Sequence, residues 1–216
     1  MLLIYTSKVT PRIIYVFKHI CTQVLGIEIK FTTKIEEFIA HPDLKFSYGK
    51  KRLGNELFIQ NVDLLFEQGL GDLDIKVQPW EESKCYFGVS ENSDIPFDIF
   101  AASFYLLSRY EEYLPHVKDN LGRFPSSESL AYKEGFLHSP VIDVWAYKFK
   151  KILAFRFADI DFKKRNYESV SIISVSHVFN FKNKGFLRSL SGAAIDLGHF
   201  KFSKVSDRIK VLLRLK

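Results

Sequence analysis

The sequence predicts an α/β fold: a mixed sheet with a βαβ opening and flanking helices. Three observations support this prediction. A periodic apolar segment lies between two short apolar runs at the start, a series of apolar runs divided by glycines follows, and a long apolar helix comes next. With 47% hydrophobic and 15% aromatic residues, the chain has enough apolar side chains for a sizeable core.

The opening segment has the pattern of a strand, a helix and a second strand. Leu2–Tyr5 is a short apolar run, and Thr10 then precedes Pro11 as an N-cap precedes the first helical residue. The apolar residues after them share one helical face: Ile13, Ile14, Phe17, Ile20, Cys21 and Val24. Gly26 marks the end of the helix, and Ile27–Phe31 alternates as a strand does.

The middle of the chain is expected to supply the other strands. Thr33 and Glu36 form a capping box that predicts a short helix. Five apolar runs between His41 and Val89 then predict strands: Phe46–Tyr48, Leu57–Ile59, Leu64–Phe66, Ile75–Val77 and Cys85–Val89. The glycines between the runs supply turns and make no phosphate-binding pattern.

The segment from Asp94 to Tyr113 is apolar on nearly all sides, which predicts a central, buried helix. Asp94 is a candidate cap, and Asp98 favours the helix N-terminus. Near the polar end of the segment, Arg109 precedes Glu112 by three residues. Two interpretations remain open for this pair: a structural ion pair, or an arginine that binds a ligand.

The second half contains two further helical regions and one candidate strand. A polar linker over 115–125 leads to Ser139-Pro140, which begins a helix with Trp145, Phe149 and Leu153 on one face. Residues 156–168 read as a charged linker, and Glu168–Val178 is apolar enough for a strand. The rest is basic and helical, so we expect one α/β domain over 1–165 and a separate segment over 166–216.

The net charge of +6 is concentrated at the C-terminal end, where residues 179–216 hold nine Lys or Arg and two Asp or Glu. Two interpretations remain open for this basic appendage with its amphipathic end: weak association with a membrane surface, or a helix that belongs to a larger fold. No nucleic-acid partner is expected. The two cysteines give no disulfide framework. Because the N-terminus lacks the pattern of a secretory signal and no apolar run is long enough to span a membrane, the expected compartment is the cytoplasm.

The sequence contains no complete catalytic or metal-binding motif. The closest pairs of its six histidines are 22 residues apart, and there is no nucleophile-elbow pattern. The adjacent glutamate pairs point in different directions on a helix and are expected to be surface charge. We therefore predict no catalytic residue, no metal site and no cofactor. The candidate binding residues are Arg109, Glu112, Asp98 and Trp145.

Three segments carry a resemblance to a known family: Pro96–Tyr113, Leu53–Phe58 and Gly135–Trp145. Together they resemble the uncharacterised N-terminal domain of bacterial polysaccharide deacetylase-like proteins, in which this domain precedes a distorted (β/α) barrel. The resemblance covers about residues 1–165. It implies that 166–216 is a short fragment of that barrel, its truncated start.

The resemblance also implies where catalytic residues would stand. In that family the first barrel strand ends in an Asp-x-Asp motif that supplies a base and a metal ligand, and a later HxxxH motif completes the metal site. In this sequence Ser174 and Ser176 occupy the two aspartate positions, and no HxxxH follows them. A serine hydroxyl is neutral, neither a carboxylate base nor a good ligand for a divalent cation.

The resemblance therefore implies a non-catalytic accessory or scaffold domain of a polysaccharide deacetylase-like protein in cell-envelope carbohydrate metabolism, with a polysaccharide or a protein as its partner. One alternative is a module that binds a glycan or nucleotide-sugar, with Trp80, Trp145 and Tyr132 as stacking faces and Arg109 as an anchor. Another is one part of a split, metal-dependent carbohydrate N-deacetylase.

Overall fold

The computed structural model describes residues 1–158, 160–162, 166–175, 181 and 185–213. The chain divides into two compact units, Met1–Arg165 and Asn166–Lys216. Within the described ranges, no helix combines the length and the apolar character that crossing a membrane requires.

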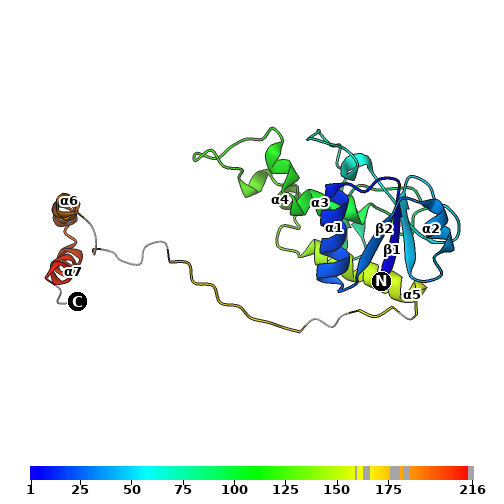
Figure 1. The fold of residues 1–216 in the computed structure, drawn as a ribbon. Helices are drawn as coiled ribbons and strands as arrows, with labels where there is room; N and C mark the ends of the chain where they lie inside the picture. Colours follow the sequence, from blue (N-terminus) through cyan, green and yellow to red (C-terminus); the bar gives the residue numbers. More distant parts are fainter. Residues whose placement is uncertain (159, 163–165, 176–180, 182–184, 214–216) are drawn as a thin grey trace. The chain divides into compact units, whose positions relative to one another are not determined.

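A four-stranded sheet in the order β2-β1-β3-β4 forms the centre of the first unit (Figure 1). The strands are β1 (Leu2–Thr6), β2 (Ile29–Thr32), β3 (Lys45–Gly49) and β4 (Leu57–Gln60). All three pairings are parallel, with Ile4 opposite Phe31 in β2 and Phe46 in β3. The α/β class and the βαβ opening are confirmed, but this sheet is parallel and not mixed.

The first helix begins as the sequence predicts. Thr10 caps α1 (Pro11–Phe17) by accepting a hydrogen bond from the backbone N–H of Ile13, and Pro11 occupies the first turn. The helix continues as a π-helix, η1 (Lys18–Val24), and the chain then turns at Gly26 with a φ of +71°. A positive φ costs a glycine little, since it has no Cβ.

The sheet is covered on both faces. On one face lie α1 with η1, α3 (Ile99–Leu107) and α5 (Val141–Arg156). On the other face lies α2 (Ile35–Ala40), whose Phe38 ring packs against Tyr5 at 5.6 Å between centroids. Burial on both faces is typical of parallel sheets and explains why their strands read as continuous apolar runs.

The core on the α1 side is aromatic. The ring of Phe17 stacks on Phe100 with 3.6 Å between centroids, and Phe46 lies parallel to Phe100 at 6.1 Å. Phe149 of α5 meets Phe100 edge to face, so rings from three helices and the sheet form one cluster. The predicted buried face of α5 is confirmed: Trp145, Phe149 and Leu153 are all inaccessible to solvent.

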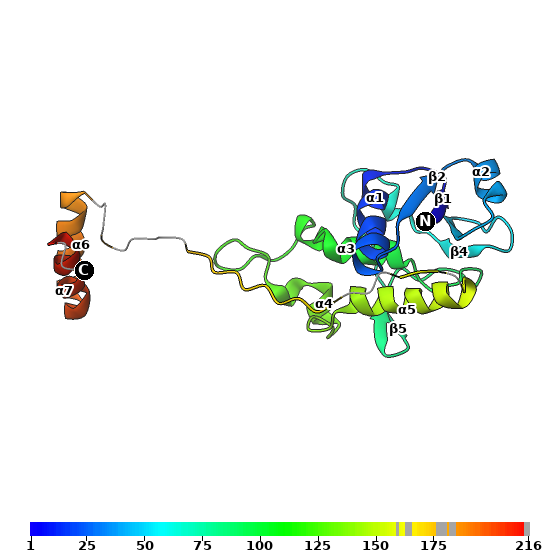
Figure 2. The ribbon, with the colours of Figure 1, turned by 60° about the horizontal axis from the view of Figure 1, so that its bottom comes forward.

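Several predicted elements of the middle region are wrong. Leu64 and Leu65 lie in a 3-10 helix, η2 (Asp63–Leu65), and Ile75–Val77 has no regular structure. The structure instead forms an antiparallel hairpin of β5 (Gln78–Trp80) and β6 (Ser83–Cys85), which lies against α5 (Figure 2). Thr33 does not cap α2; the neighbouring Thr32 hydroxyl accepts from the Lys34 N–H instead.

The predicted central helix is shorter than the sequence pattern indicates. Its cap is Asp98, whereas Asp94 accepts a hydrogen bond from the Phe58 N–H of β4. After α3 the chain forms two 3-10 helices, η3 (Tyr110–Tyr113) and η4 (Ser126–Glu128), and a short α4 (Leu130–Lys133). The connection between η3 and η4, green in Figure 1, runs away from the sheet.

The second unit is a helical hairpin preceded by an irregular segment. Residues 166–175 form no strand and are exposed, so the predicted strand over Glu168–Val178 is wrong for the residues described; 176–178 lie outside them. A barrel fragment is therefore not shown. The predicted helical tail is confirmed as α6 (Phe186–Gly198) and α7 (Phe202–Leu212).

Candidate functional site

Two of the four predicted binding residues lie together at the end of α3. Arg109 lies one residue beyond Ser108, the C-cap of α3, and has left-handed backbone angles, φ 54° and ψ 42°. Its Nε donates to the carboxylate of Glu112, and the Glu112 N–H donates to the Arg109 carbonyl at 3.0 Å. The ion pair predicted from sequence is therefore present, but it belongs to a 3-10 turn and not to a continuous helix.

A second ion pair lies on the connection between η3 and η4. The carboxylate of Asp119 accepts from the backbone N–H groups of Leu121 and Arg123 and from the Arg123 guanidinium, all within 2.8–2.9 Å. These bonds close a tight turn in which Gly122 has a φ of +75°. The backbone and guanidinium N–H groups of Arg123 hold the pKa of Asp119 below its ordinary value, so it is ionised at neutral pH.

The two ion pairs line one open hollow of about 650 Å³, the size of small-ligand sites. We call it the two-arginine hollow; its lining consists of Arg109, Glu112, Asp119, Arg123, Phe124, Pro125 and Ser126. Phe124 is held edge-on by the ring of His116 at 4.9 Å between centroids. Charged, hydroxyl and aromatic groups therefore converge on one space.

The arginines of the hollow retain hydrogen-bonding capacity. Their side chains are 72% and 69% exposed, whereas Glu112 and Asp119 are each 26% exposed. The ion pairs engage Nε of Arg109 and Nε and Nη2 of Arg123. Among the described residues, nothing else bonds to these guanidinium groups, which leaves three donor nitrogens directed to solvent.

A half-buried carboxylate anchors this region to α4. Glu111 accepts from the Leu130 N–H at 2.8 Å and from the Tyr105 hydroxyl. Partial burial raises its pKa, and the neighbouring Glu112 adds to the effect. Because Glu111 joins the start of η3 to the start of α4, it holds both ends of the connection that forms the hollow.

The other two predicted binding residues lie in the core and meet no ligand space. Asp98 is inaccessible; one oxygen accepts from the Phe100 and Ala101 N–H groups, and the other from the Tyr48 hydroxyl at 2.7 Å and the Val62 N–H at 2.8 Å. Burial raises the pKa of Asp98 to about 6. This carboxylate ties α3 to β3 and the loop after β4.

Trp145 is also a core residue, and its indole Nε1 donates to the Lys84 carbonyl of β6 at 3.0 Å. The other proposed stacking faces are not part of the hollow. The ammonium group of Lys148 covers the Trp80 ring at 4.6 Å, and Tyr132 is exposed on α4.

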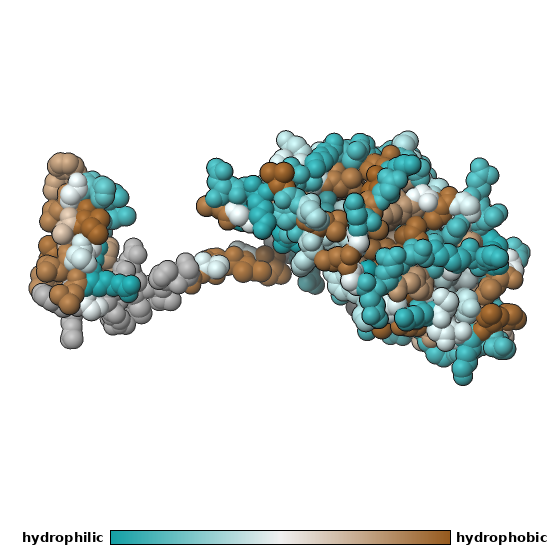
Figure 3. Space-filling view, turned by 90° about the horizontal axis from the view of Figure 1, so that it is seen from above, coloured by the Kyte–Doolittle hydropathy of each residue, from teal (hydrophilic) through white to brown (hydrophobic). Residues whose placement is uncertain are grey.

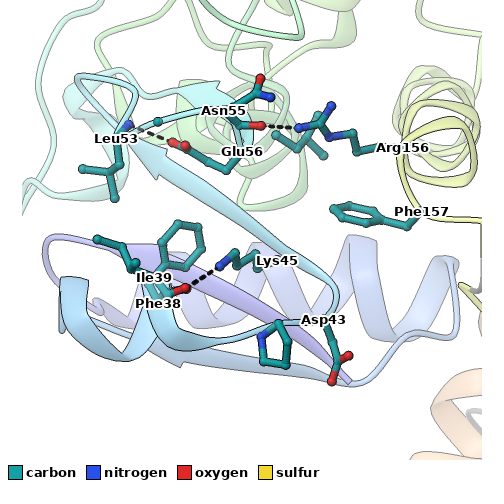
Figure 4. A pocket seen from close by; sticks show the side chains of 12 residues that line it. Phe38, Ile39, Asp43, Lys45, Leu53, Asn55, Glu56, Arg156 and Phe157 are labelled. Carbon is teal, nitrogen blue, oxygen red and sulfur yellow. Dashed lines mark hydrogen bonds between the residues drawn. The ribbon is translucent and has the colours of Figure 1, made fainter.

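A second, more apolar hollow of about 500 Å³ lies between α2, the β3–β4 connection and the end of α5 (Figure 4). Two of its charged groups are already engaged. Lys45 Nζ donates to the carbonyls of Phe38, Ile39 and His41, and Glu56 accepts from Ser47 and Leu53. This arrangement closes the end of α2, so we rank it below the two-arginine hollow as a ligand site.

The metal chemistry implied by the family resemblance does not fit the residues present. Ser174 is exposed on an irregular segment, and Ser176 lies outside the described residues. In the part of the chain that the structure describes, no three His, Cys, Asp or Glu side chains form a group able to hold a metal ion. Cys21 and Cys85 are free and buried, and burial raises the pKa of both thiols.

Asp119, Arg123 and Phe124 were not predicted as site residues, because they lie in the segment that the sequence indicates to be a polar linker. The signal that could have found them is an aspartate followed by a glycine–arginine pair, which predicts a tight turn closed by the aspartate side chain.

By fold, the first unit is an α/β domain on a parallel four-stranded sheet, with a charged hollow beyond the end of α3. Residues 2–158 match a family described as a family of unknown function, DUF7033, and the chain belongs to this family. Neither the curated proteins nor the solved structures contain a match to the chain.

Proposed function

We propose that residues 1–165 are a non-catalytic accessory domain of a polysaccharide deacetylase-like protein, and that the two-arginine hollow binds a carbohydrate. The observation that carries the proposal is the placement of two arginine–carboxylate pairs around one space beside an aromatic ring. The link to deacetylase-like proteins rests on the sequence resemblance alone.

The chemistry of the hollow suits a sugar. Each sugar hydroxyl both donates and accepts a hydrogen bond, so neighbouring hydroxyls match a guanidinium that donates beside a carboxylate that accepts. The three free nitrogens of Arg109 and Arg123 supply donors. The second carboxylate oxygen of Glu112 supplies an acceptor, whereas the Asp119 carboxylate already accepts four hydrogen bonds and holds Arg123 in place. The ring of Phe124 offers an apolar surface to the C–H groups of a pyranose.

The non-catalytic part of the proposal rests on Ser174 and Ser176, which stand where the resemblance places the catalytic aspartates. We further propose that residues 166–216 correspond to the start of the barrel. A strand there would need a partner strand to satisfy its backbone N–H and C=O groups.

Two free cysteines are typical of a reducing compartment, and we propose that the protein lies in the cytoplasm.

Calorimetric titration of the full chain tests the proposal. The ligands are oligomers of N-acetylglucosamine, their deacetylated forms, and a uridine-diphosphate sugar as the nucleotide-sugar alternative. We expect saturable binding of an oligosaccharide and a loss of at least tenfold in affinity for the double variant Arg109→Gln, Arg123→Gln. Lys30→Gln is the matched control, since it removes an exposed ion pair on β2 and should bind normally.

Null titrations with every ligand would remove the carbohydrate proposal. Tighter binding of the nucleotide-sugar, lost in the same double variant, would favour the alternative, because phosphate groups match guanidinium donors. A separate assay for acetate release from acetylated oligomers, with Zn²⁺ added, addresses catalysis. Sustained release by the purified chain would contradict the non-catalytic assignment.

A further inference from the structure

In the helical hairpin of the second unit, the most buried side chains are polar and the large apolar side chains are exposed. On α6, the residues facing α7 are small or polar and include Ser189, Gly192 and Asp196, and α7 contributes Arg208 to the same interface. A helix pair in water normally places its large apolar side chains between the helices. This hairpin has the opposite arrangement.

An arginine forms the centre of the hairpin. Only 8% of Arg208 is exposed; its Nη2 donates to Asp196 at 2.7 Å and its Nη1 to the Ser189 carbonyl at 3.3 Å. The guanidinium lies directly against Gly192, where an added Cβ would be 2.6 Å from Nη1. The absence of a side chain at Gly192 therefore allows the ion pair to join the two helices.

The large apolar side chains of the hairpin face outward. Each of the following is 48–80% exposed: Leu187, Leu190, Ile195, Leu197, Phe200, Phe202, Ile209, Leu212 and Leu213. Figure 3 shows apolar surface over much of the face of the hairpin in view. Phe202 and Ile209 of α7 and its C-cap Leu213 are spaced by seven and four residues, which places them on one side of the helix.

The charges on the exterior are mainly basic. The described residues 185–213 contain five Lys or Arg and two Asp, a net charge of +3. Arg208 and Asp196 neutralise each other inside the hairpin. Arg188, Lys201, Lys204 and Lys210 lie on the exposed surface, around the outward apolar side chains.

We propose that the α6–α7 hairpin binds the surface of an anionic lipid bilayer. The apolar side chains enter the boundary between headgroups and acyl chains, and the lysines remain among the anionic headgroups. With 13 and 11 residues, the helices measure about 20 and 16 Å at 1.5 Å per residue, shorter than the hydrocarbon core of about 30 Å. The hairpin therefore lies at the membrane surface.

The internal polar contact suits this location. A salt bridge shielded by two helices is screened little by salt, and it keeps its strength beside hydrocarbon. An apolar interface between the helices would not be stabilised beside hydrocarbon, because lipid tails offer the same apolar contacts. Small residues allow the helices to approach closely. The hairpin can thus hold its shape while its apolar exterior leaves water.

Co-sedimentation of the full chain with vesicles tests the proposal. One set contains phosphatidylcholine with phosphatidylglycerol, and the other contains phosphatidylcholine alone. We expect binding to the anionic vesicles that weakens in high salt. Lys201→Gln with Lys204→Gln should weaken it about 30-fold, since each basic residue contributes about fivefold. Phe202→Ser with Leu213→Ser should also reduce it, whereas Ile39→Ser, an exposed apolar residue on α2, should leave it unchanged.

Circular dichroism of each variant establishes that the hairpin helices remain formed, so that weaker binding is not caused by unfolding. Failure of the full chain to sediment with anionic vesicles would overturn the proposal, as would binding that neither double variant weakens. A third outcome would also show that the proposal is wrong. The full chain would self-associate in solution, the variant Phe202→Ser with Leu213→Ser would be monomeric, and neither protein would bind vesicles. The apolar face would then bind protein and not lipid.

Discussion

Because the backbone of Arg109 is left-handed, we expect glycine at this position to give a more stable protein than alanine. In a continuous α-helix, glycine costs about 1 kcal/mol relative to alanine. At the observed φ of 54° and ψ of 42°, a residue with a Cβ pays about 1–2 kcal/mol that glycine avoids. The greater freedom of glycine in the unfolded chain offsets about 0.5–1 kcal/mol of this gain. Arg109→Gly should therefore be about 1 kcal/mol more stable than Arg109→Ala.

The comparison between the two variants isolates the backbone effect. Both remove the ion pair with Glu112, which contributes at most about 1 kcal/mol because Arg109 is 72% exposed. Urea unfolding followed by circular dichroism measures the difference in free energy of unfolding. In thermal unfolding, the same difference should appear as about 2–4 °C in Tm for a domain of this size. Arg109→Ala matching or exceeding Arg109→Gly in stability would refute the left-handed conformation. Both variants should lose the proposed ligand.

Three further predictions concern buried groups. Tyr48→Phe removes one of four hydrogen bonds to the Asp98 carboxylate and should cost about 1–3 kcal/mol in urea unfolding; an unchanged midpoint would contradict the bond. Because burial raises the pKa of Asp98 to about 6, its folded form binds the proton more tightly than its unfolded form, and its contribution to stability is lost as pH rises from about 4 through 6. That loss, about 3 kcal/mol, should be absent from the pH profile of Asp98→Asn, and identical profiles would refute the assignment. Gly192→Ala should push the Arg208 guanidinium away from α6 and lower the helical circular dichroism signal, whereas an intact signal would show that the close contact is unnecessary.

The elements predicted correctly are those whose signals are local. Thr10 and Pro11 begin α1 through a side-chain bond and a fixed φ, both of which depend on adjacent residues. The spacing of Trp145 and Phe149 identifies the buried face of α5 in the same way. The apolar runs of β3 and β4 were found because strands buried on both faces are apolar throughout.

The errors arise where distant contacts decide the structure. The run after Glu168 has strand-forming residues, but a strand exists only beside a partner strand. No strand among the described residues pairs with 166–175. Leu64 and Leu65 are buried as a strand would be, yet their carbonyls accept from Arg12 and Thr10 of the α1 region and hold a 3-10 turn.

The candidate site was only partly predictable for the same reason. The apolar period of α3 does not reveal that the helix ends at Leu107, so the sequence pattern places Arg109 on a helix. The turn at Asp119 returns Arg123 to the same hollow, and a pairing between two separate turns has no sequence period. The sequence does not distinguish Asp98 from a ligand-binding carboxylate, because its four hydrogen-bond partners come from β3, the loop after β4 and α3.

Chemical-shift mapping of the full chain during titration with an N-acetylglucosamine oligomer tests the central claim most directly. Binding in the two-arginine hollow predicts amide shifts concentrated between Arg109 and Ser126, with the largest at Arg123 and Phe124, and none in Arg109→Gln, Arg123→Gln. Shifts that cluster instead around Phe38 and Phe157, at the apolar hollow beside α2, would contradict it, as would a spectrum that the oligomer leaves unchanged.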